Sequence, residues 1–239
     1  MSHIGNRKAL ITGGASGIGK LMGELMLQKG LDTLIIWDVN ETLLQTTTND
    51  FKQRGFSVLP YVVDVMNVDA VIAAAQQVKK AVGKIDILIN NAGTLVSKPF
   101  ENITFDEINR IFNVNYIGPA LLVKYLLPLL KAGQAHVVNI TSMGGYQGSM
   151  KFKGLSHYSA SKAALAVLTE CLAEEYKKEG IIFNALALGA VQTEMLAEAF
   201  PNFKAPVTAE QMGEFIANFA MNGKTFFNGK VLPVALSTP

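Results

Sequence analysis

Short apolar runs alternate with longer amphipathic segments from one end of the chain to the other. The short runs predict strands at residues 8–12, 33–37, 56–63, 85–89, 134–140, 181–188 and 231–236. Apolar positions at helical spacing predict helices that end near residues 28, 54, 82, 130 and 178. Because strands and helices alternate without a repeat or a linker, the pattern predicts an α/β fold whose parallel sheet has right-handed crossovers.

Composition limits the class of protein. The 239 residues are 49% hydrophobic and 17% charged, which suits a chain that buries a large core. The net charge is +2 and no run of Lys or Arg exceeds two residues, so no nucleic-acid partner is expected. The most apolar stretch, residues 116–130, contains Lys124 and two prolines, so no membrane span is expected. An apolar strand begins within ten residues of Met1, which argues against a signal peptide and favours a cytoplasmic protein.

Sulfur and metal chemistry play little part in what the sequence predicts. Cys171 is the single cysteine, which excludes an intrachain disulfide. Its neighbours Leu168 and Leu172 are apolar, so Cys171 is expected to pack in the core. No cluster of His, Cys and carboxylates has metal-ligand spacing, and no metal is expected.

A glycine-rich turn lies between the first strand and the first helix. It reads Thr12-Gly13-Gly14-Ala15-Ser16-Gly17-Ile18-Gly19. Glycine lets the backbone turn tightly and approach a ligand, and the N-terminus of a helix attracts phosphate. The turn therefore predicts a phosphate-binding loop of the kind that holds a dinucleotide.

The second strand ends at Asp38, about twenty residues after this turn, where a ribose-binding carboxylate is expected. A carboxylate there accepts hydrogen bonds from ribose hydroxyls and repels a 2′-phosphate. No Lys or Arg lies within residues 13–19 or just after Asp38 to offset that repulsion, so the sequence favours NAD over NADP. The alternative is that Asp38 caps the helix that starts near Glu41.

Further strands also end in residues suited to ligand binding. Asp64 either faces an adenine ring or caps the next helix, and Asn91 either pairs with an adenine or braces the central strand. Ser142 and Gly189 end the strands at 134–140 and 181–188. Because the carboxyl ends of parallel strands meet at one edge of the sheet, we expect a ligand site along that edge.

Tyr158 and Lys162 lie four residues apart at the start of a predicted helix, so both side chains share one face. A cation there favours the phenolate and is expected to lower the pKa of the phenol from about 10. Such a phenol passes a proton in either direction. The alternative is a chance pair, since Tyr and Lys occur one turn apart on many helices.

Together these motifs resemble the classical short-chain dehydrogenases/reductases over residues 7–234. Thr12-Gly13-x-x-x-Gly17-x-Gly19 is similar to the family's nucleotide loop, and Asn90-Asn91-Ala92-Gly93 is similar to its central-strand motif. The family's catalytic tetrad is matched in order by Asn115, Ser142, Tyr158 and Lys162.

The resemblance implies a single-domain Rossmann fold over residues 1–239. Its doubly wound, seven-stranded parallel sheet would have the order 3-2-1-4-5-6-7, with helices on both faces. It also implies an NAD(P)-dependent oxidoreductase that transfers a hydride between the cofactor, with NAD favoured, and a secondary alcohol or ketone. Family members usually form dimers or tetramers, so a homodimer or homotetramer is expected.

The resemblance also assigns roles to side chains. Tyr158 would be the acid/base, Lys162 would lower its pKa and hold the nicotinamide ribose, Ser142 would bind the substrate oxygen, and Asn115 would support a water. Thr193 resembles the residue that binds the nicotinamide carboxamide. The expected cofactor-binding residues are Gly13, Ser16, Gly17, Ile18, Gly19, Asp38, Asp64, Val65, Asn91, Gly93, Tyr158, Lys162, Gly189, Val191 and Thr193.

The substrate side is expected to involve a short lid at residues 190–207. Its apolar residues suit a small apolar or mixed carbonyl compound, or they pack a short helix onto the sheet. The segment from Ser142 to Tyr158 is a few residues longer than the family resemblance implies. It carries Lys151 and Lys153, which either face solvent or meet an acidic substrate. The family often has Asp-Gly-Gly after its last strand, and the predicted strand at residues 231–236 is not followed by it.

Two alternative functions remain open at this stage. A non-catalytic dinucleotide-binding regulator with the same fold predicts a damaged tetrad, whereas all four residues are present. A sugar-nucleotide epimerase or dehydratase predicts a larger C-terminal substrate region than the roughly fifty residues that follow Gly189.

Overall fold

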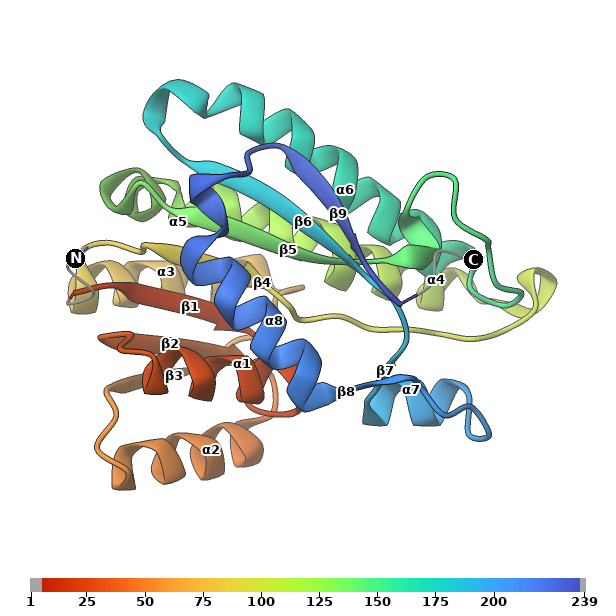
Figure 1. Cartoon of the computed structure of the whole chain (residues 1–239), viewed down its shortest axis with the longest axis horizontal. Helices are drawn as coiled ribbons and strands as arrows, with labels where there is room; N and C mark the ends of the chain where they lie inside the picture. Colours follow the sequence, from red (N-terminus) through yellow and green to blue (C-terminus); the bar gives the residue numbers. More distant parts are fainter. Residues whose placement is uncertain (1–5, 237–239) are drawn as a thin grey trace.

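The computed structural model describes residues 6–236, and its main feature is one parallel sheet (Figure 1). The sheet contains β1 (Lys8–Thr12), β2 (Thr33–Asp38), β3 (Val58–Val62), β4 (Ile87–Asn90), β5 (His136–Ser142), β6 (Ile182–Leu188) and β9 (Lys230–Val234). The order of these seven strands is β3-β2-β1-β4-β5-β6-β9, and every neighbouring pair is parallel. The predicted order 3-2-1-4-5-6-7 is confirmed, with β9 as the seventh strand. Two short strands, β7 (Val191–Gln192) and β8 (Val207–Thr208), pair separately.

Helices cover both faces of the sheet, as predicted (Figure 1). One face is covered by α1 (Gly17–Gln28), α2 (Glu41–Gln53) and α8 (Ala209–Asn222). The other is covered by α3 (Val68–Val82), α5 (Gly118–Gly133) and α6 (Ser156–Glu175). Helix α4 (Phe105–Phe112) packs against α6 and the π-helix that follows it. The short helices are α7 (Glu194–Ala199), the π-helix η2 (Asn113–Ile117) and the 3-10 turns η1 (Phe100–Asn102), η3 (Met143–Gly145), η4 (Lys177–Glu179) and η5 (Gly223–Thr225).

The central strands read as nearly continuous apolar runs because both faces of the sheet are buried there, whereas the edge strands β3 and β9 are only partly buried. On β1, Ala9 and Ile11 pack under α1, α2 and α8, whereas Leu10 packs under α3 and α5. The predicted strand ends differ from the observed ones by no more than two residues. No helix within residues 6–236 has the length and apolar character that crossing a bilayer requires.

A buried polar chain ties α6 to the middle of the sheet. The Asn90 side-chain amide on β4 donates to Asn139 Oδ1 on β5 across 2.7 Å. The Asn139 amide then donates to Thr169 Oγ1 on α6 across 2.8 Å. Since buried polar groups require partners, these bonds fix the height at which α6 crosses the sheet. The first turn of α6 therefore reaches the carboxyl edge.

The predicted helix at 104–130 is divided, and the division positions a polar residue. Thr104 caps α4 in a reciprocal capping box with Glu107. The π-helix at 113–117 follows, and Gly118 N donates to Asn113 O where α5 begins. The irregularity between the two helices is this π-helix and not Pro119. Pro119 lies in the first turn of α5, where a missing N–H costs little.

The prediction that Cys171 packs in the core is wrong, because this side chain is exposed. The buried face of α6 is defined by Ser161, Leu165, Thr169 and Ala173 at four-residue intervals. Cys171 lies two residues from Thr169 and from Ala173, so the helix turns it toward the opposite side. Apolar neighbours in sequence are poor guides to burial on a helix, since adjacent residues face different directions.

Candidate active site

The glycine-rich loop closes on itself between β1 and α1. Gly13 has φ +63° and donates its N–H to Trp37 O across 2.8 Å. A methyl group on Gly19 would lie 2.0 Å from Gly13 O, so no larger residue fits there. Gly17 has φ +49° and is exposed, and beyond its chain neighbours no atom lies within 4 Å of the place that a Cβ would take. The loop therefore leaves its outer side open to a ligand.

The N-terminus of α1 is available to an anion. Ser16 precedes the helix, is exposed and makes no side-chain capping bond, and the first turn carries no acidic residue. Ile18 is half-buried and packs against the core beneath α1. The unpaired N–H groups and the positive end of the helix dipole therefore suit a phosphate group.

Asp38 is held against this loop. Its Oδ2 accepts a hydrogen bond from Ala15 N across 3.0 Å, and its Oδ1 accepts from Asn40 N across 2.9 Å. Asn40, and not Asp38, caps α2 by accepting from Leu43 N. The capping alternative for Asp38 is therefore wrong, and its negative charge lies beside the glycine-rich loop.

Asp64 and Val65 follow β3 at the same edge. Asp64 Oδ1 accepts from Met66 N across 2.9 Å, whereas Asn67 caps α3. The capping alternative for Asp64 is thus wrong too. Val65 is buried, and a methyl group on Gly118 would lie 3.1 Å from its Cβ. Close packing between this turn and α5 explains the glycine at 118.

Asn91 braces the end of the central strands. Its side-chain amide donates to Thr12 O and to Gly13 O, each across 3.0 Å. Thr12 Oγ1 accepts from Asn91 N and Ala92 N, each across 3.1 Å. The bracing interpretation of Asn91 is confirmed by these bonds. Thr12 was not predicted to act here; its signal was a hydroxyl at the end of an apolar strand just before a glycine.

Gly93 faces two members of the predicted tetrad. A methyl group at this position would lie 3.4 Å from both Asn115 Oδ1 and Lys162 Nζ. Asn115 is fully buried, accepts from Thr94 N and donates to Thr94 O and Ser161 Oγ across 2.9 to 3.0 Å. The backbone satisfies most of its hydrogen bonds, yet the π-helix still brings it beside Lys162.

Tyr158, Ser142 and Lys162 come together where β5 ends and α6 begins. The Ser142 hydroxyl accepts from Gly144 N across 3.1 Å and lies close enough to the Tyr158 phenol to lower its pKa. Lys162 Nζ lies 5.9 Å from the centre of the Tyr158 ring. It donates to Ile140 O across 2.9 Å and is 4% exposed.

Burial controls the charges of this group. It raises the pKa of the Tyr158 phenol above its ordinary value, and the nearby Ser142 hydroxyl offsets part of that rise. Burial also lowers the pKa of Lys162 to about 8 from 10.5. The pKa of Tyr158 is therefore raised and not lowered as predicted, because desolvation of the phenol outweighs any attraction by the Lys162 cation, whose Nζ donates to Ile140 O. Tyr158 is therefore a neutral phenol at pH 7.

Ser161 is a member of the site that the sequence reasoning missed. Its hydroxyl donates to Tyr158 O across 2.7 Å and accepts from the Asn115 amide across 3.0 Å. The signal was its position three residues after Tyr158, from which a serine on a helix bonds back to a carbonyl. Ser161 thus joins the segment of Asn115 to that of Tyr158.

The residues after β6 border the same edge. Gly189 N donates to Val234 O across 2.9 Å. Val191 is buried. Thr193 Oγ1 accepts from Leu196 N across 3.2 Å and so caps α7. The sequence did not predict this capping role for Thr193.

Two lysines of the lengthened loop differ in their surroundings. Lys151 Nζ donates to Tyr146 O across 2.6 Å and to Ser149 Oγ across 2.8 Å. Lys153 is exposed and faces solvent. Lys151 therefore stabilises its own loop, an arrangement that neither sequence-based alternative described.

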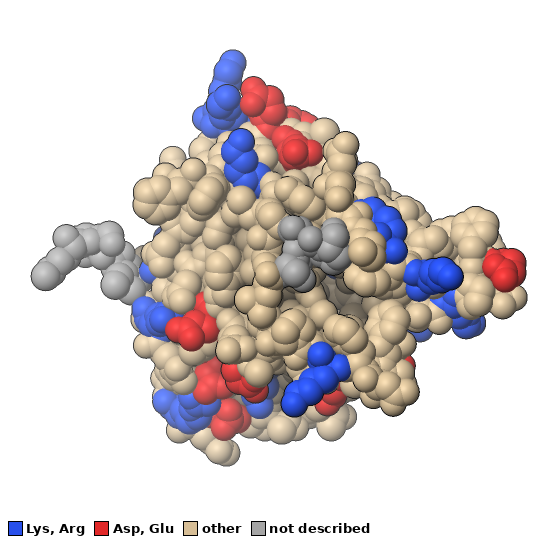
Figure 2. All heavy atoms as spheres, turned by 45° about the vertical axis from the view of Figure 1, so that its right-hand side comes forward, with Lys and Arg blue, Asp and Glu red and all other residues tan. Residues whose placement is uncertain are grey.

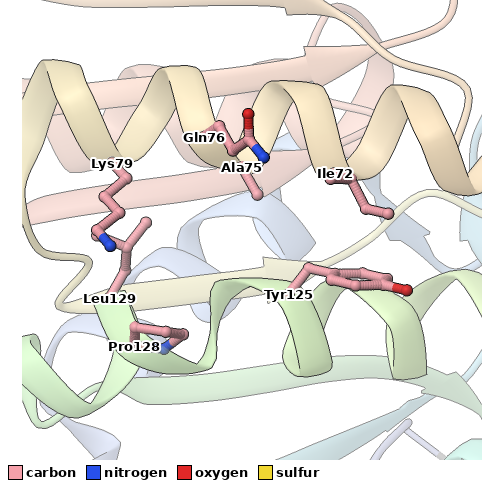
Figure 3. Close-up of a pocket in the computed structure, with 7 residues that line it drawn as sticks. All are labelled: Ile72, Ala75, Gln76, Lys79, Tyr125, Pro128 and Leu129. Carbon is pink, nitrogen blue, oxygen red and sulfur yellow. The ribbon is translucent and has the colours of Figure 1, made fainter.

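Figure 2 brings the right-hand side of Figure 1 forward, and uncharged side chains fill most of this face, with Lys, Arg, Asp and Glu scattered over it. Two hollows lie elsewhere on the molecule. One of about 210 Å³ lies between α3 and α5, where Ile72 and Tyr125 face each other (Figure 3). The other, about 310 Å³, lies between β3 and α3. Neither contains a predicted site residue, so we place the site by its converging side chains. No group of three or more His, Cys, Asp or Glu suited to a metal occurs among residues 6–236.

Comparisons with known proteins agree with this geometry. The family model described as short chain dehydrogenase matches residues 7–203. An uncharacterized oxidoreductase of Bacillus subtilis (strain 168), YxbG, is 31% identical over 90% of this chain and 76% of its own. A diacetyl reductase, (S)-acetoin forming, of Staphylococcus epidermidis is 29% identical over 80% of this chain and 73% of its own.

Solved structures give the same result. Levodione reductase superposes with a TM-score of 0.86 and 27% identity, covering 96% of both chains. The 3-ketoacyl-(acyl-carrier-protein) reductase from Brucella melitensis, solved with NADH, has a TM-score of 0.87 and 25% identity over 97% of both chains. The chain therefore belongs to the short chain dehydrogenase family, whose members are hydride-transferring oxidoreductases.

Proposed function

We propose that this protein transfers a hydride between NAD and a secondary alcohol or ketone, with Tyr158 as the acid/base. The main support for this proposal is one observation. Four side chains come together at the carboxyl edge of the sheet, next to the glycine-rich loop: Ser142, Tyr158, Lys162 and Asn115. A proton donor and a nucleotide loop at the same edge suit a reaction in which charge develops on a carbonyl oxygen while hydride moves to carbon.

The cofactor would lie along the carboxyl edge. The backbone of Gly13, Ser16, Gly17, Ile18 and Gly19 would hold the pyrophosphate at the N-terminus of α1, which has neither a side-chain cap nor an acidic residue. Bound NAD supplies the hydride-accepting nicotinamide. The remaining contacts would come from Asp38 at the adenosine ribose, Asp64, Val65 and Asn91 around the adenine, Gly93 and Lys162 at the nicotinamide ribose, and Gly189, Val191 and Thr193 at the nicotinamide.

Asp38 supports the preference for NAD. Its carboxylate is fixed by Ala15 N and Asn40 N, and a 2′-phosphate in its place would meet a like charge. The structure of the Brucella melitensis relative was solved with NADH, which is consistent with this choice.

Tyr158 would donate its proton to the carbonyl oxygen during reduction. Its raised pKa keeps the phenol protonated at pH 7, which suits the role of acid. The Ser142 hydroxyl would donate a second hydrogen bond to the same oxygen. Lys162 would stabilise the phenolate that forms, and Asn115 would hold a water beside Lys162.

The substrate side would be closed by a lid at residues 190–207, in one cofactor-binding domain that spans residues 1–239. This lid includes α7 and presents Met195 and Phe203, both partly exposed apolar residues. We infer a small apolar or mixed ketone, in keeping with relatives named for diacetyl and levodione.

The active species would be a homodimer or homotetramer. The family resemblance assigns the contact to the helices that carry Asn115 and Tyr158. Exposed apolar residues on those segments, Ile117 and Val167, support that assignment.

Tyr158→Phe tests the proposed chemistry. The variant keeps the ring but lacks the transferable proton, so turnover with a ketone such as diacetyl should fall by about 10³-fold or more. The dissociation constant for NADH, measured by fluorescence, should stay within about twofold of the parent value, since only a hydroxyl is removed. Retained turnover would exclude Tyr158 as the acid. A parent protein that binds NADH but turns over no alcohol or ketone would instead favour the regulator.

Asp38→Asn tests the cofactor preference. Asparagine keeps an oxygen that accepts from Ala15 N but removes the negative charge. Parent protein should bind NADH more tightly than NADPH. In the variant, the ratio of the NADPH dissociation constant to the NADH dissociation constant should fall about tenfold or more. Equal affinities in the parent protein would overturn the preference for NAD.

A further inference from the structure

Strand β9 carries the last described residues, Ala235 and Leu236, to the carboxyl edge. The register pairs Ser142 with Leu188 and Leu188 with Val234. These three residues form one row across neighbouring parallel strands, roughly 10 Å from first to last. Residues after Val234 therefore lie beyond the level of Ser142, on the side from which a substrate approaches. Figure 1 shows β6 and β9 ending together at this edge.

Close packing fixes where the chain leaves β9. Gly189 N donates to Val234 O across 2.9 Å. A methyl group on Gly189 would lie 2.7 Å from the Cβ of Ala235, so Ala235 sits directly against the backbone of Gly189. Leu236 follows as the next residue, and its position relative to the end of β6 is set by this contact.

Leu236 carries an exposed apolar side chain two residues after the end of β9. It is 78% exposed, among the most exposed large apolar residues described. Two partly exposed apolar side chains, Met195 and Phe203, belong to the segment that leaves β6 at the same edge. The sequence has no Asp-Gly-Gly after β9, and Ala235 and Leu236 follow the strand.

We propose that Leu236 is a specificity-determining residue that contacts the apolar group of the substrate. The substrate class is then a ketone, or the matching alcohol, with an alkyl chain or ring beside the reacting carbon. This inference rests on the proposed function, because it takes Ser142 as the residue that binds the carbonyl oxygen. The apolar part of the substrate would extend from Ser142 along the row toward the end of β9 and cover Leu236.

A series of methyl ketones from 2-butanone to 2-octanone tests this contact. Leu236→Ala should lower the ratio of kcat/KM for 2-octanone to that for 2-butanone about tenfold, mainly through KM, since each apolar contact favours the longer chain. Leu236→Met, which keeps the apolar volume, should retain most of the parental ratio. Phe226→Ala is the matched control, because Phe226 is 79% exposed and lies before β9, at the opposite edge of the sheet.

The outcomes separate this inference from the proposed function. A ratio in Leu236→Ala that is unchanged, raised, or equal to that of Phe226→Ala overturns the role of Leu236 while ketone reduction stands. If the protein binds these ketones without reducing them, the proposed function fails. The ratio of the dissociation constant for 2-butanone to that for 2-octanone, measured through NADH fluorescence, then tests Leu236. If this ratio in Leu236→Ala is unchanged from the parent, raised, or equal to that in Phe226→Ala, the role of Leu236 is overturned. A protein that neither binds nor reduces any member of the series overturns both.

Discussion

The Asn115 side-chain amide donates a hydrogen bond to the Ser161 hydroxyl across 3.0 Å, which joins the π-helix to α6. Ser161 in turn donates to Tyr158 O across 2.7 Å. Asn115 and Ser161 are both fully buried. A π-helix is a less stable local conformation than an α-helix, and this bond is one tertiary contact that holds it in place.

Ser161→Ala should therefore destabilise the protein. The substitution leaves one N–H of the buried Asn115 amide without its partner, at a cost of about 1 to 3 kcal/mol in the free energy of unfolding. Urea denaturation at pH 7 measures this change. Ser159→Ala is the matched control on the same helix, because the Ser159 hydroxyl is buried without a hydrogen-bond partner. Equal losses in the two variants would contradict a specific role for the bond.

The fold was predictable because its central strands are buried on both faces and its helices on one. Each strand of the main sheet lies in a short, mainly apolar run, and these runs with the crossover rule predicted a parallel sheet. The order of its strands was implied by the family resemblance. Asp38, Ser142 and Gly189 were found for the same reason: parallel strands bring their carboxyl ends to one edge.

Other properties of the site depend on contacts that sequence spacing does not contain. The pKa of Tyr158 follows from how deeply the phenol is buried, and a four-residue separation from Lys162 says nothing of that. The exposure of Cys171 depends on the direction in which α6 faces the sheet. The partners of Asn115 depend on a π-helix, for which the sequence pattern offers no signal beyond a proline nearby.

Lys162→Met should stabilise the protein while impairing turnover. Burial lowers the pKa of Lys162 to about 8 from 10.5, so holding the charged form in the folded state costs about 3 kcal/mol at pH 7. Methionine avoids this cost but loses the bond to Ile140 O, worth about 1 kcal/mol. We therefore expect the free energy of unfolding to rise by about 2 kcal/mol at pH 7.

The pH dependence of the stability difference between Lys162→Met and the parent protein tests whether the buried charge is its cause. Between about pH 8 and 10.5 the unfolded chain binds more protons at Lys162 than the folded chain, so the stability of the parent protein rises with pH across that interval. The advantage of Lys162→Met in urea denaturation should shrink accordingly as pH rises. A difference that is constant from pH 7 to 10 would point to packing instead.

His136 should make the protein acid-sensitive. It is fully buried, and burial lowers its pKa to about 4 from 6.5. The unfolded chain therefore binds more protons below pH 6.5, and stability should fall by about 3 kcal/mol as pH falls from 6.5 to about 4. His136 Nδ1 pairs with Ala220 O and Nε2 with the Asn184 amide, so neutral imidazole satisfies both neighbours.

His136→Gln should remove most of this dependence between pH 5 and 6.5, an interval above the ordinary pKa values of most carboxylates. Urea denaturation at several pH values gives the slope of the free energy of unfolding against pH. His157→Gln, a change near the start of α6, is the control and should leave the slope in place. A steep slope that survives in His136→Gln would show that another group controls acid sensitivity.

Gly93→Ala should separate cofactor binding from folding. The added methyl group would lie 3.4 Å from Asn115 Oδ1 and Lys162 Nζ, which is ordinary van der Waals contact, so the free energy of unfolding should change by less than about 1 kcal/mol. The same methyl group would occupy the space where we place the nicotinamide ribose, so the dissociation constant for NADH should rise about tenfold or more.

Gly19→Ala provides the contrast, because its methyl group would lie 2.0 Å from Gly13 O and the glycine-rich loop would have to move. That variant should lose both stability and NADH affinity, as thermal denaturation and fluorescence titration would show. If Gly93→Ala also lost stability, the space beside Lys162 would serve internal packing. If Gly93→Ala kept the parental affinity for NADH, the nicotinamide ribose would have to lie elsewhere along the carboxyl edge.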